Sequence, residues 1–214
     1  MKKSFKPSEL LGPLPVVMVS CGDEKENNII TIAWTGIINS VPPMTYVSVR
    51  KSRHSHEMIK RTGEFVINLT TEETARATDW CGVKSGRDFD KFKETGLSKA
   101  EGEIVKCPMI AESPVNLECR VTEIKELGSH DMFLAEIVKV HVNEEIIDEN
   151  GKFDLLKAGM VGFLHGEYVG IKTSPVGRFG FSVMKPKTRK RISKAEHEKR
   201  VAKNREKRKE TAGR

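Results

Sequence analysis

The feature that most constrains the fold is a pair of long β patterns joined by a short turn. Residues 115–125 and 133–142 are rich in β-branched and apolar side chains, and Gly128 lies in the segment between them. Two such runs around a glycine-containing turn are typical of a β-hairpin. Because strands joined by a tight turn pair antiparallel, this hairpin favours an antiparallel sheet over an alternating β–α–β arrangement.

Shorter patterns complete the expected fold. Apolar runs predict strands at residues 14–20, 29–35, 44–50 and 64–69, and the segments between them predict short helices at residues 54–61, 71–80 and 88–94. Ser52 or Ser55 is the expected cap of the first helix, and Gly63 is its expected stop. Residues 154–183 are rich in glycine and aromatic side chains, which indicates loops with one or two strands. The expected fold class is therefore mainly β with short helices, as an antiparallel barrel.

Charge divides the chain of 214 residues into two parts. Residues 185–214 hold 14 lysines and arginines against four glutamates, a net charge of +10, whereas the preceding residues hold 23 basic against 26 acidic side chains. We therefore expect one domain at residues 1–184 and a basic tail at residues 185–214, helical or disordered. Such a tail favours either a solubilising extension or a weak contact with nucleic acid or another polyanion.

Several features bear on the cellular compartment. The longest apolar run, residues 14–21, is too short to cross a bilayer, so we expect no membrane insertion. Prolines and charges interrupt the N-terminal region, so we expect no export signal and a cytoplasmic protein. Cys21, Cys81, Cys107 and Cys119 form no C-x-x-C pair, which favours reduced thiols and leaves two disulfides as the alternative.

The sequence lacks the signatures of several large enzyme classes. It has no G-x-G-x-x-G after a strand, no P-loop, no H-E-x-x-H and no G-x-S-x-G. These absences disfavour a Rossmann domain, a P-loop NTPase, a zincin and an α/β-hydrolase. His54 and His56 would point apart on a helix, so we expect no metal site.

Two segments, by contrast, place cations and hydroxyls at the start of a helix. They read RKSRHSHE at residues 50–57 and SGRDFDKF at residues 85–92. Free N–H groups at a helix start favour an anion, and arginine supplies forked donors for phosphate oxygens. The two segments could hold one charged cofactor between them, or they could simply be capped helix starts with solvated charges.

Trp34 lies among small or hydroxyl-bearing neighbours, Thr31, Ala33, Thr35 and Gly36. Small side chains let a planar ligand approach the backbone, and an indole can border such a ligand. A tryptophan packed in the core is the alternative.

Taken in order, these segments resemble the flavin reductase-like, FMN-binding split-barrel family, especially its flavoredoxin and archaeal ferric reductase branch. The resemblance covers residues 14–183. It rests on several motifs, and the order and spacing of these motifs are specific to the family. The motifs lie at residues 15–22, 28–35, 42–44, 48–50, 62–69, 81–82, 85–88, 90–92, 112–119 and 177–182.

The resemblance implies a homodimer of six-stranded split barrels with noncovalent FMN near the subunit interface. It places the isoalloxazine ring, the phosphate and a covering segment on three stretches of the chain. The residues concerned are Thr31, Ala33, Trp34 and Thr35 for the ring; Ser48, Val49, Arg50, Ser52, Arg53, His54 and Ser55 for the phosphate; and Cys81, Gly82, Ser85, Arg87 and Lys91 for the cover.

The implied function is an NAD(P)H-dependent flavin or ferric reductase, with NADH or NADPH as a transient electron donor. An alternative is an electron carrier that exchanges electrons with a protein partner, and another is a basic-tailed RNA-associated protein. Because a flavin carries the redox chemistry itself, no catalytic acid, base or nucleophile is expected among the side chains. His165, in a glycine-rich loop, is a candidate to gate access.

Overall fold

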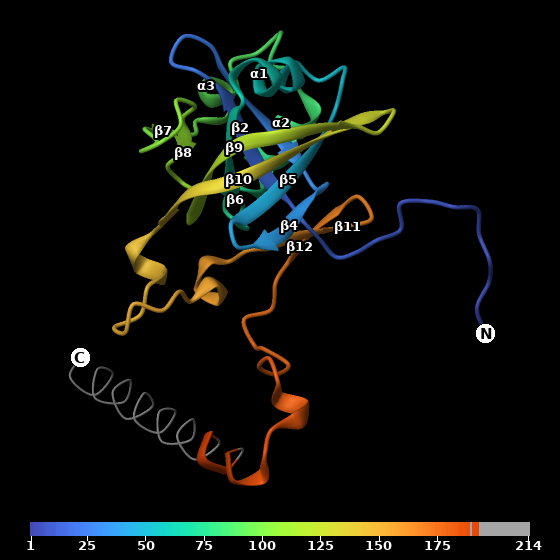
Figure 1. The fold of residues 1–214 in the computed structure, drawn as a ribbon, viewed down its shortest axis with the longest axis vertical. Coiled ribbons are helices and arrows are strands. Elements are labelled where there is room, and N and C mark those ends of the chain that lie inside the picture. Colours follow the sequence, from blue (N-terminus) through green and yellow to red (C-terminus); the bar gives the residue numbers. More distant parts are fainter. Residues whose placement is uncertain (189, 193–214) are drawn as a thin grey trace, which may run out of the picture. The chain divides into compact units, whose positions relative to one another are not determined.

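The computed structural model describes residues 1–188 and 190–192, and it divides into two compact units (Figure 1). The first unit is Met1–Thr173 and holds every strand of the described chain; the second begins at Ser174 and contains the short 3-10 helix η3 (Phe181–Val183). The domain boundary expected at residue 184 stays a prediction. Most of the expected basic tail, residues 189 and 193–214, lies outside the described residues.

A seven-stranded antiparallel sheet forms the centre of the first unit, in the order β3-β2-β6-β9-β10-β5-β4. The expected hairpin is confirmed: β9 and β10 pair from Asp131 opposite Glu126 to Val142 opposite Val115. The strands are β2 (Val17–Gly22), β3 (Asn27–Ile32), β4 (Thr35–Ser40), β5 (Pro43–Arg50), β6 (Glu64–Leu69), β9 (Val115–Glu126) and β10 (His130–Val142).

The strand predicted at residues 29–35 is wrong in one respect, because the chain divides there into β3 and β4. Ala33 and Trp34 link these two strands, which lie at opposite edges of the sheet. The Ser48 N–H donates to the Trp34 carbonyl at 2.9 Å and fixes the link beside β5. The link accordingly joins one edge of the curved sheet to the other, and β4 is a strand that the sequence pattern missed.

Smaller sheets flank the central one. β1 (Leu14–Pro15) pairs with β11 (Val161–Leu164), which pairs in turn with β12 (Glu167–Gly170). The last two confirm the expectation of one or two strands within residues 154–183. The remaining short elements are β7 (Lys99–Ala100), β8 (Met109–Ile110), η1 (Glu144–Ile146) and η2 (Leu155–Ala158).

The first helix, α1 (His54–Thr62), ends as expected at Gly63, whose φ of 69° suits a residue without a side chain. The expected cap is wrong, because Arg53 occupies the N-cap position and no side chain caps the helix. Ser55 lies inside the first turn, where its hydroxyl accepts a hydrogen bond from Asn28. No helix in the described part of the chain is long and apolar enough to cross a membrane.

The other two helices begin later than predicted. α2 (Ala75–Val83) starts after a turn in which Thr71 and Thr74 hydrogen-bond each other's backbone N–H groups. α3 (Lys91–Thr95) starts after Asp90, whose carboxylate accepts the Lys93 N–H and thereby caps the helix.

The main core lies between the sheet and α1. Its fully buried side chains include Val19, Val47, Ile59, Phe65 and Phe133. Burying such apolar surface contributes about 25 cal/mol per Å² and holds α1 against the strands. The start of α1 is thereby fixed next to the end of β5.

Candidate functional site

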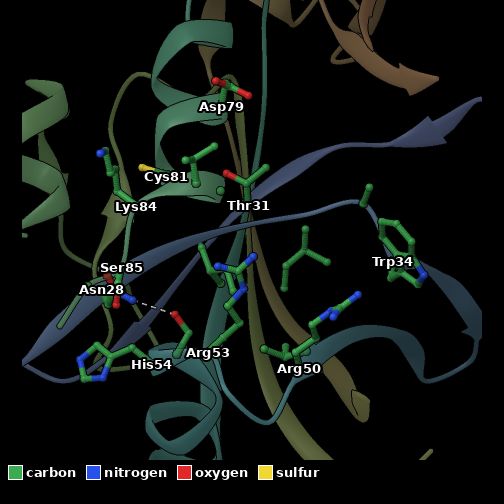
Figure 2. Close-up of a pocket in the computed structure, with 18 of the residues that line it drawn as sticks. Asn28, Thr31, Trp34, Arg50, Arg53, His54, Asp79, Cys81, Lys84 and Ser85 are labelled. Atoms are coloured by element: carbon green, nitrogen blue, oxygen red, sulfur yellow. Dashed lines mark hydrogen bonds between the residues drawn. The ribbon is translucent and has the colours of Figure 1, made fainter. Parts of the chain in front are cut away.

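A cavity of about 780 Å³ lies where β3, the β3–β4 link, the end of β5, the start of α1 and the end of α2 meet (Figure 2). Segments that are far apart in sequence therefore line one site. Of the residues proposed from the sequence, the cavity is lined by Thr31, Ala33, Trp34, Ser48, Val49, Arg50, Ser52, Arg53, His54, Ser55, Cys81, Gly82, Ser85, Arg87 and Lys91.

Thr35 is the proposed residue that the structure does not bring to the cavity. It begins β4, and its hydroxyl donates to the Tyr46 carbonyl on β5 at 2.6 Å. The hydroxyl of Thr31 is also engaged, because it donates to the Thr78 carbonyl of α2. Thr31 consequently contributes its position in the wall rather than a free hydroxyl.

One end of the cavity is basic and polar. Arg53 and His54 stand at the start of α1, where the N–H groups of His54 and Ser55 precede the first helical hydrogen bond, which His56 donates to the Arg53 carbonyl. Arg87 reaches across from the segment after α2 and donates to the Ser52 carbonyl at 3.1 Å. The two segments singled out for phosphate binding therefore meet at this end.

Asn28 joins these segments and was missed by the sequence analysis. Its side chain is 4% exposed, and its Nδ2 donates to the Ser55 hydroxyl at 2.9 Å. A side chain added at Gly86 would place its Cβ 2.2 Å from Asn28 Oδ1, so the close approach requires glycine. The one available signal was an amide next to the isoleucines of a strand.

Lys91 is the most unusual charge in the cavity wall. It is 4% exposed, and its Nζ donates to the Cys81 carbonyl at 2.6 Å. Burial lowers the pKa of Lys91 to about 8, and the positive charge of Arg53 acts in the same direction. Burial likewise raises the pKa of the Cys81 thiol to about 11, so this thiol stays protonated near neutrality.

The other end of the cavity is aromatic. Trp34 stacks on His130, with 6.4 Å between ring centroids and 10° between ring planes, and its indole is 43% exposed. Figure 2 shows Arg50 directed toward the side where Trp34 lies. Consistently, burial and the charge of Arg50 lower the pKa of His130. The interpretation of Trp34 as the border of a site fits its exposure better than a core role does.

Tyr168 and Asp79 form another part of the cavity wall. Tyr168 on β12 donates its hydroxyl to Asp79 of α2 at 3.3 Å, and both residues line the cavity. Burial and the Asp79 carboxylate raise the pKa of Tyr168 to about 12. His165 lies elsewhere, in a smaller cavity of about 240 Å³ that shares Trp34, Phe163 and Gly166 with the larger one.

A buried pair, His56 and Asp131, lies next to the basic end of the cavity. His56 on α1 and Asp131 on β10 are 2% and 3% exposed, and their Nε2 and Oδ2 atoms are 2.8 Å apart. Lys51 Nζ lies 3.4 Å from the other carboxylate oxygen. Despite its burial, the pKa of Asp131 is lowered by His56 and Lys51. The pair ties the first turn of α1 to the central sheet.

The sequence and the fold together place the chain in a known family. The chain belongs to the flavin reductase like domain family, which matches residues 12–171. Its fold is the split barrel of that family, mainly β with short helices.

Flavoredoxins are among its similar solved structures. The flavoredoxin of Desulfovibrio vulgaris (Miyazaki F) is 32% identical, with a TM-score of 0.79 over 85% of this chain and 100% of that chain. The flavoredoxin from Methanosarcina acetivorans is 28% identical, with a TM-score of 0.73 over 86% of this chain and 100% of that chain. The NADH-dependent FMN reductase AsuE2 of Streptomyces nodosus subsp. asukaensis is 23% identical over 73% of this chain and 85% of its own length.

Proposed function

We propose that this protein binds FMN noncovalently in the large cavity and acts as an NAD(P)H-dependent flavin or ferric reductase. The observation that carries the proposal is the division of one cavity into a basic end at the start of α1 and an aromatic end at Trp34. A flavin nucleotide has the matching division between its phosphate and its planar ring. Membership of the flavin reductase like family supports the same ligand.

The size and charge of the cavity fit this ligand. A volume of about 780 Å³ lies within the usual range of about 300–1,000 Å³ for small-molecule sites. Arg50, Arg53, Lys84, Arg87 and Lys91 line it, while Asp79 supplies the one carboxylate among the described lining residues. A predominantly cationic wall favours an anionic ligand.

The basic end has the donors that a phosphate requires. Arg53 offers a guanidinium, Ser52 and Ser55 offer hydroxyls, and the first turn of α1 offers free N–H groups at the positive end of the helix dipole. Because Gly86 lacks a side chain, the covering segment can approach closely. These residues would hold the phosphate.

The remaining wall would orient the ring and set its electrostatic environment. When bound, FMN supplies hydride acceptance and electron transfer. Ala33 and Trp34 would border the ring, and the positive charges of Lys91 and Arg87 favour an additional negative charge in the cavity. The side chains thus bind, orient and polarise, and no proton-transfer catalyst is assigned.

A flavoredoxin-type electron carrier is the second candidate, and the two flavoredoxin structures favour it. Mixing the FMN-loaded protein with NADH or NADPH in a stopped-flow spectrophotometer separates the candidates. A reductase loses its oxidised flavin absorbance at a rate that matches steady-state turnover. Loss far slower than turnover, or no loss with either nucleotide, would exclude the reductase and leave the carrier.

We also propose that the protein is a homodimer whose contact includes β4. This edge strand and its turn expose Ile37, Ile38 and Val41 by 69%, 44% and 89%. An apolar edge strand tends to pair with another chain. Light scattering should give a dimer for the native chain and a monomer for Ile37→Lys; a native monomer would contradict the proposal.

A further inference from the structure

Lys91 is a buried cation without a carboxylate partner among the described residues. Its side chain is 4% exposed, lines the large cavity, and has the Cys81 carbonyl as its hydrogen-bond acceptor. That carbonyl belongs to the last turn of α2, where lysine side chains commonly satisfy unpaired carbonyls. One ammonium group has three donors, so this single bond leaves capacity for a further acceptor.

The surroundings of Lys91 do not neutralise its charge. Burial is the largest cause that lowers the pKa of Lys91; an ionised Cys81 would raise that pKa, Arg53 lowers it with a second positive charge from the start of α1, and an ionised Cys21 would raise it. Burial raises the pKa of these thiols to about 11 and about 12, so neither supplies a negative charge near neutrality. Asp79, the carboxylate in the described lining, is hydrogen-bonded to Tyr168.

The other ionisable side chains of the cavity wall are Arg50, His54, Lys84, Arg87 and His130, and none of them is an acid. Burying an unpaired charge is costly, and a lysine in this position relieves the cost by losing its proton. A neutral amine still donates to the Cys81 carbonyl. Lys91 can therefore exist in either protonation state without losing this contact.

We propose that binding of the anionic flavin nucleotide is coupled to uptake of one proton by the Nζ atom of Lys91. This inference rests on the proposed function, because the nucleotide supplies the missing negative charge. The balance is simple: the neutral amine takes a proton from the buffer and becomes an ammonium group, and no other bond changes. Lys91 thus makes the affinity of the cavity for its ligand depend on pH in the alkaline range.

The size of the effect follows from linkage. With a pKa of about 8 in the free protein, Lys91 is about one-tenth neutral at pH 7 and about nine-tenths neutral at pH 9. If the bound anion restores an ordinary lysine pKa of about 10.4, uptake rises from about 0.1 to about 0.9 proton across this range. The dissociation constant for FMN then increases about tenfold from pH 7 to pH 9.

Isothermal titration calorimetry of the full chain with FMN measures this uptake directly. Titrations at about pH 7, 8 and 9, each in two buffers of different ionisation enthalpy, give the number of protons taken up. A phosphate monoester is already a dianion well above its second pKa of about 6, so FMN itself contributes little there. Uptake that rises toward one proton supports the proposal.

Three variants make the measurement specific. Lys91→Arg keeps a cation that does not titrate in this range, so FMN should bind without proton uptake. Its dissociation constant should therefore not show the tenfold increase from pH 7 to pH 9. Lys84→Met removes another cavity lysine and should weaken binding while keeping the uptake. His54→Asn should also keep the uptake. If Lys91→Arg does not fold, Lys91→Met tests the same point, since its uptake should also vanish.

The outcomes separate this inference from the proposed function. FMN binding without proton uptake at pH 9, or uptake that survives in Lys91→Arg, overturns the role of Lys91 and leaves FMN binding intact. Failure of the native chain to bind FMN at any pH overturns the proposed function and this inference together.

Discussion

Replacing Arg53 with alanine should weaken FMN binding while leaving riboflavin binding nearly unchanged, because riboflavin lacks the phosphate. Arg53 lies at the start of α1, lines the basic end of the cavity and is exposed to solvent. Hydrogen bonds to charged groups contribute about 1.5–3 kcal/mol, and solvent exposure places Arg53 at the lower end of that range. We therefore expect the FMN dissociation constant to increase about tenfold.

Arg50→Ala is the matched control, since it also removes an arginine side chain from the cavity wall. Arg50 is directed toward the side of Trp34, and it pairs with His130 across β5 and β10 (Figure 2). Its loss should change FMN and riboflavin affinity by a similar factor. Fluorescence titration of each variant with both ligands gives the two ratios.

The reasoning fails if Arg53→Ala weakens riboflavin as much as it weakens FMN. It also fails if Arg50→Ala shows the larger phosphate-specific loss. Circular dichroism and thermal unfolding confirm that each variant is folded before its affinities are compared.

Two further predictions concern buried polar groups. Asn28→Ala should weaken FMN binding about five- to tenfold and lower the free energy of unfolding by about 1–3 kcal/mol, because Ser55 loses its donor. Asn150→Ala, at an exposed turn, should do neither. Unchanged affinity in a folded Asn28→Ala protein would contradict the role of Asn28. Glu118 is fully buried, yet its pKa is lowered by His141 and by three backbone N–H groups. Its contribution to stability is therefore present above about pH 5 and is lost as the pH falls through the lowered pKa. Glu118→Gln should therefore flatten the acid limb of stability measured by urea unfolding between about pH 6 and pH 3, and an unchanged slope would contradict this role.

The sequence predicted those parts of the fold that local patterns determine. The β9–β10 hairpin follows from two long β patterns around Gly128, and the end of α1 follows from a glycine that adopts a positive φ. The sequence did not reveal that the chain leaves one edge of the sheet at Ala33 and joins the other at Thr35. That crossing depends on tertiary packing, which a run of β-forming residues does not encode.

In the candidate site too, the sequence predicted local features and missed those that depend on tertiary packing. Cations and hydroxyls at two helix starts were visible in the sequence, and the structure brings them to one cavity. The burial of Lys91 was not visible, because charge patterns do not reveal which lysine packs under a helix end. Thr35 was assigned to the cavity with its neighbours, but the turn into β4 directs its hydroxyl to Tyr46 instead.

A crystal structure of the protein with FMN bound tests the central claim most directly. We expect the phosphate within hydrogen-bond distance of Arg53 and of the first N–H groups of α1, with the flavin ring bordered by Trp34. A phosphate bound at any other place, or a cavity that stays empty in crystals grown with saturating FMN, would contradict it.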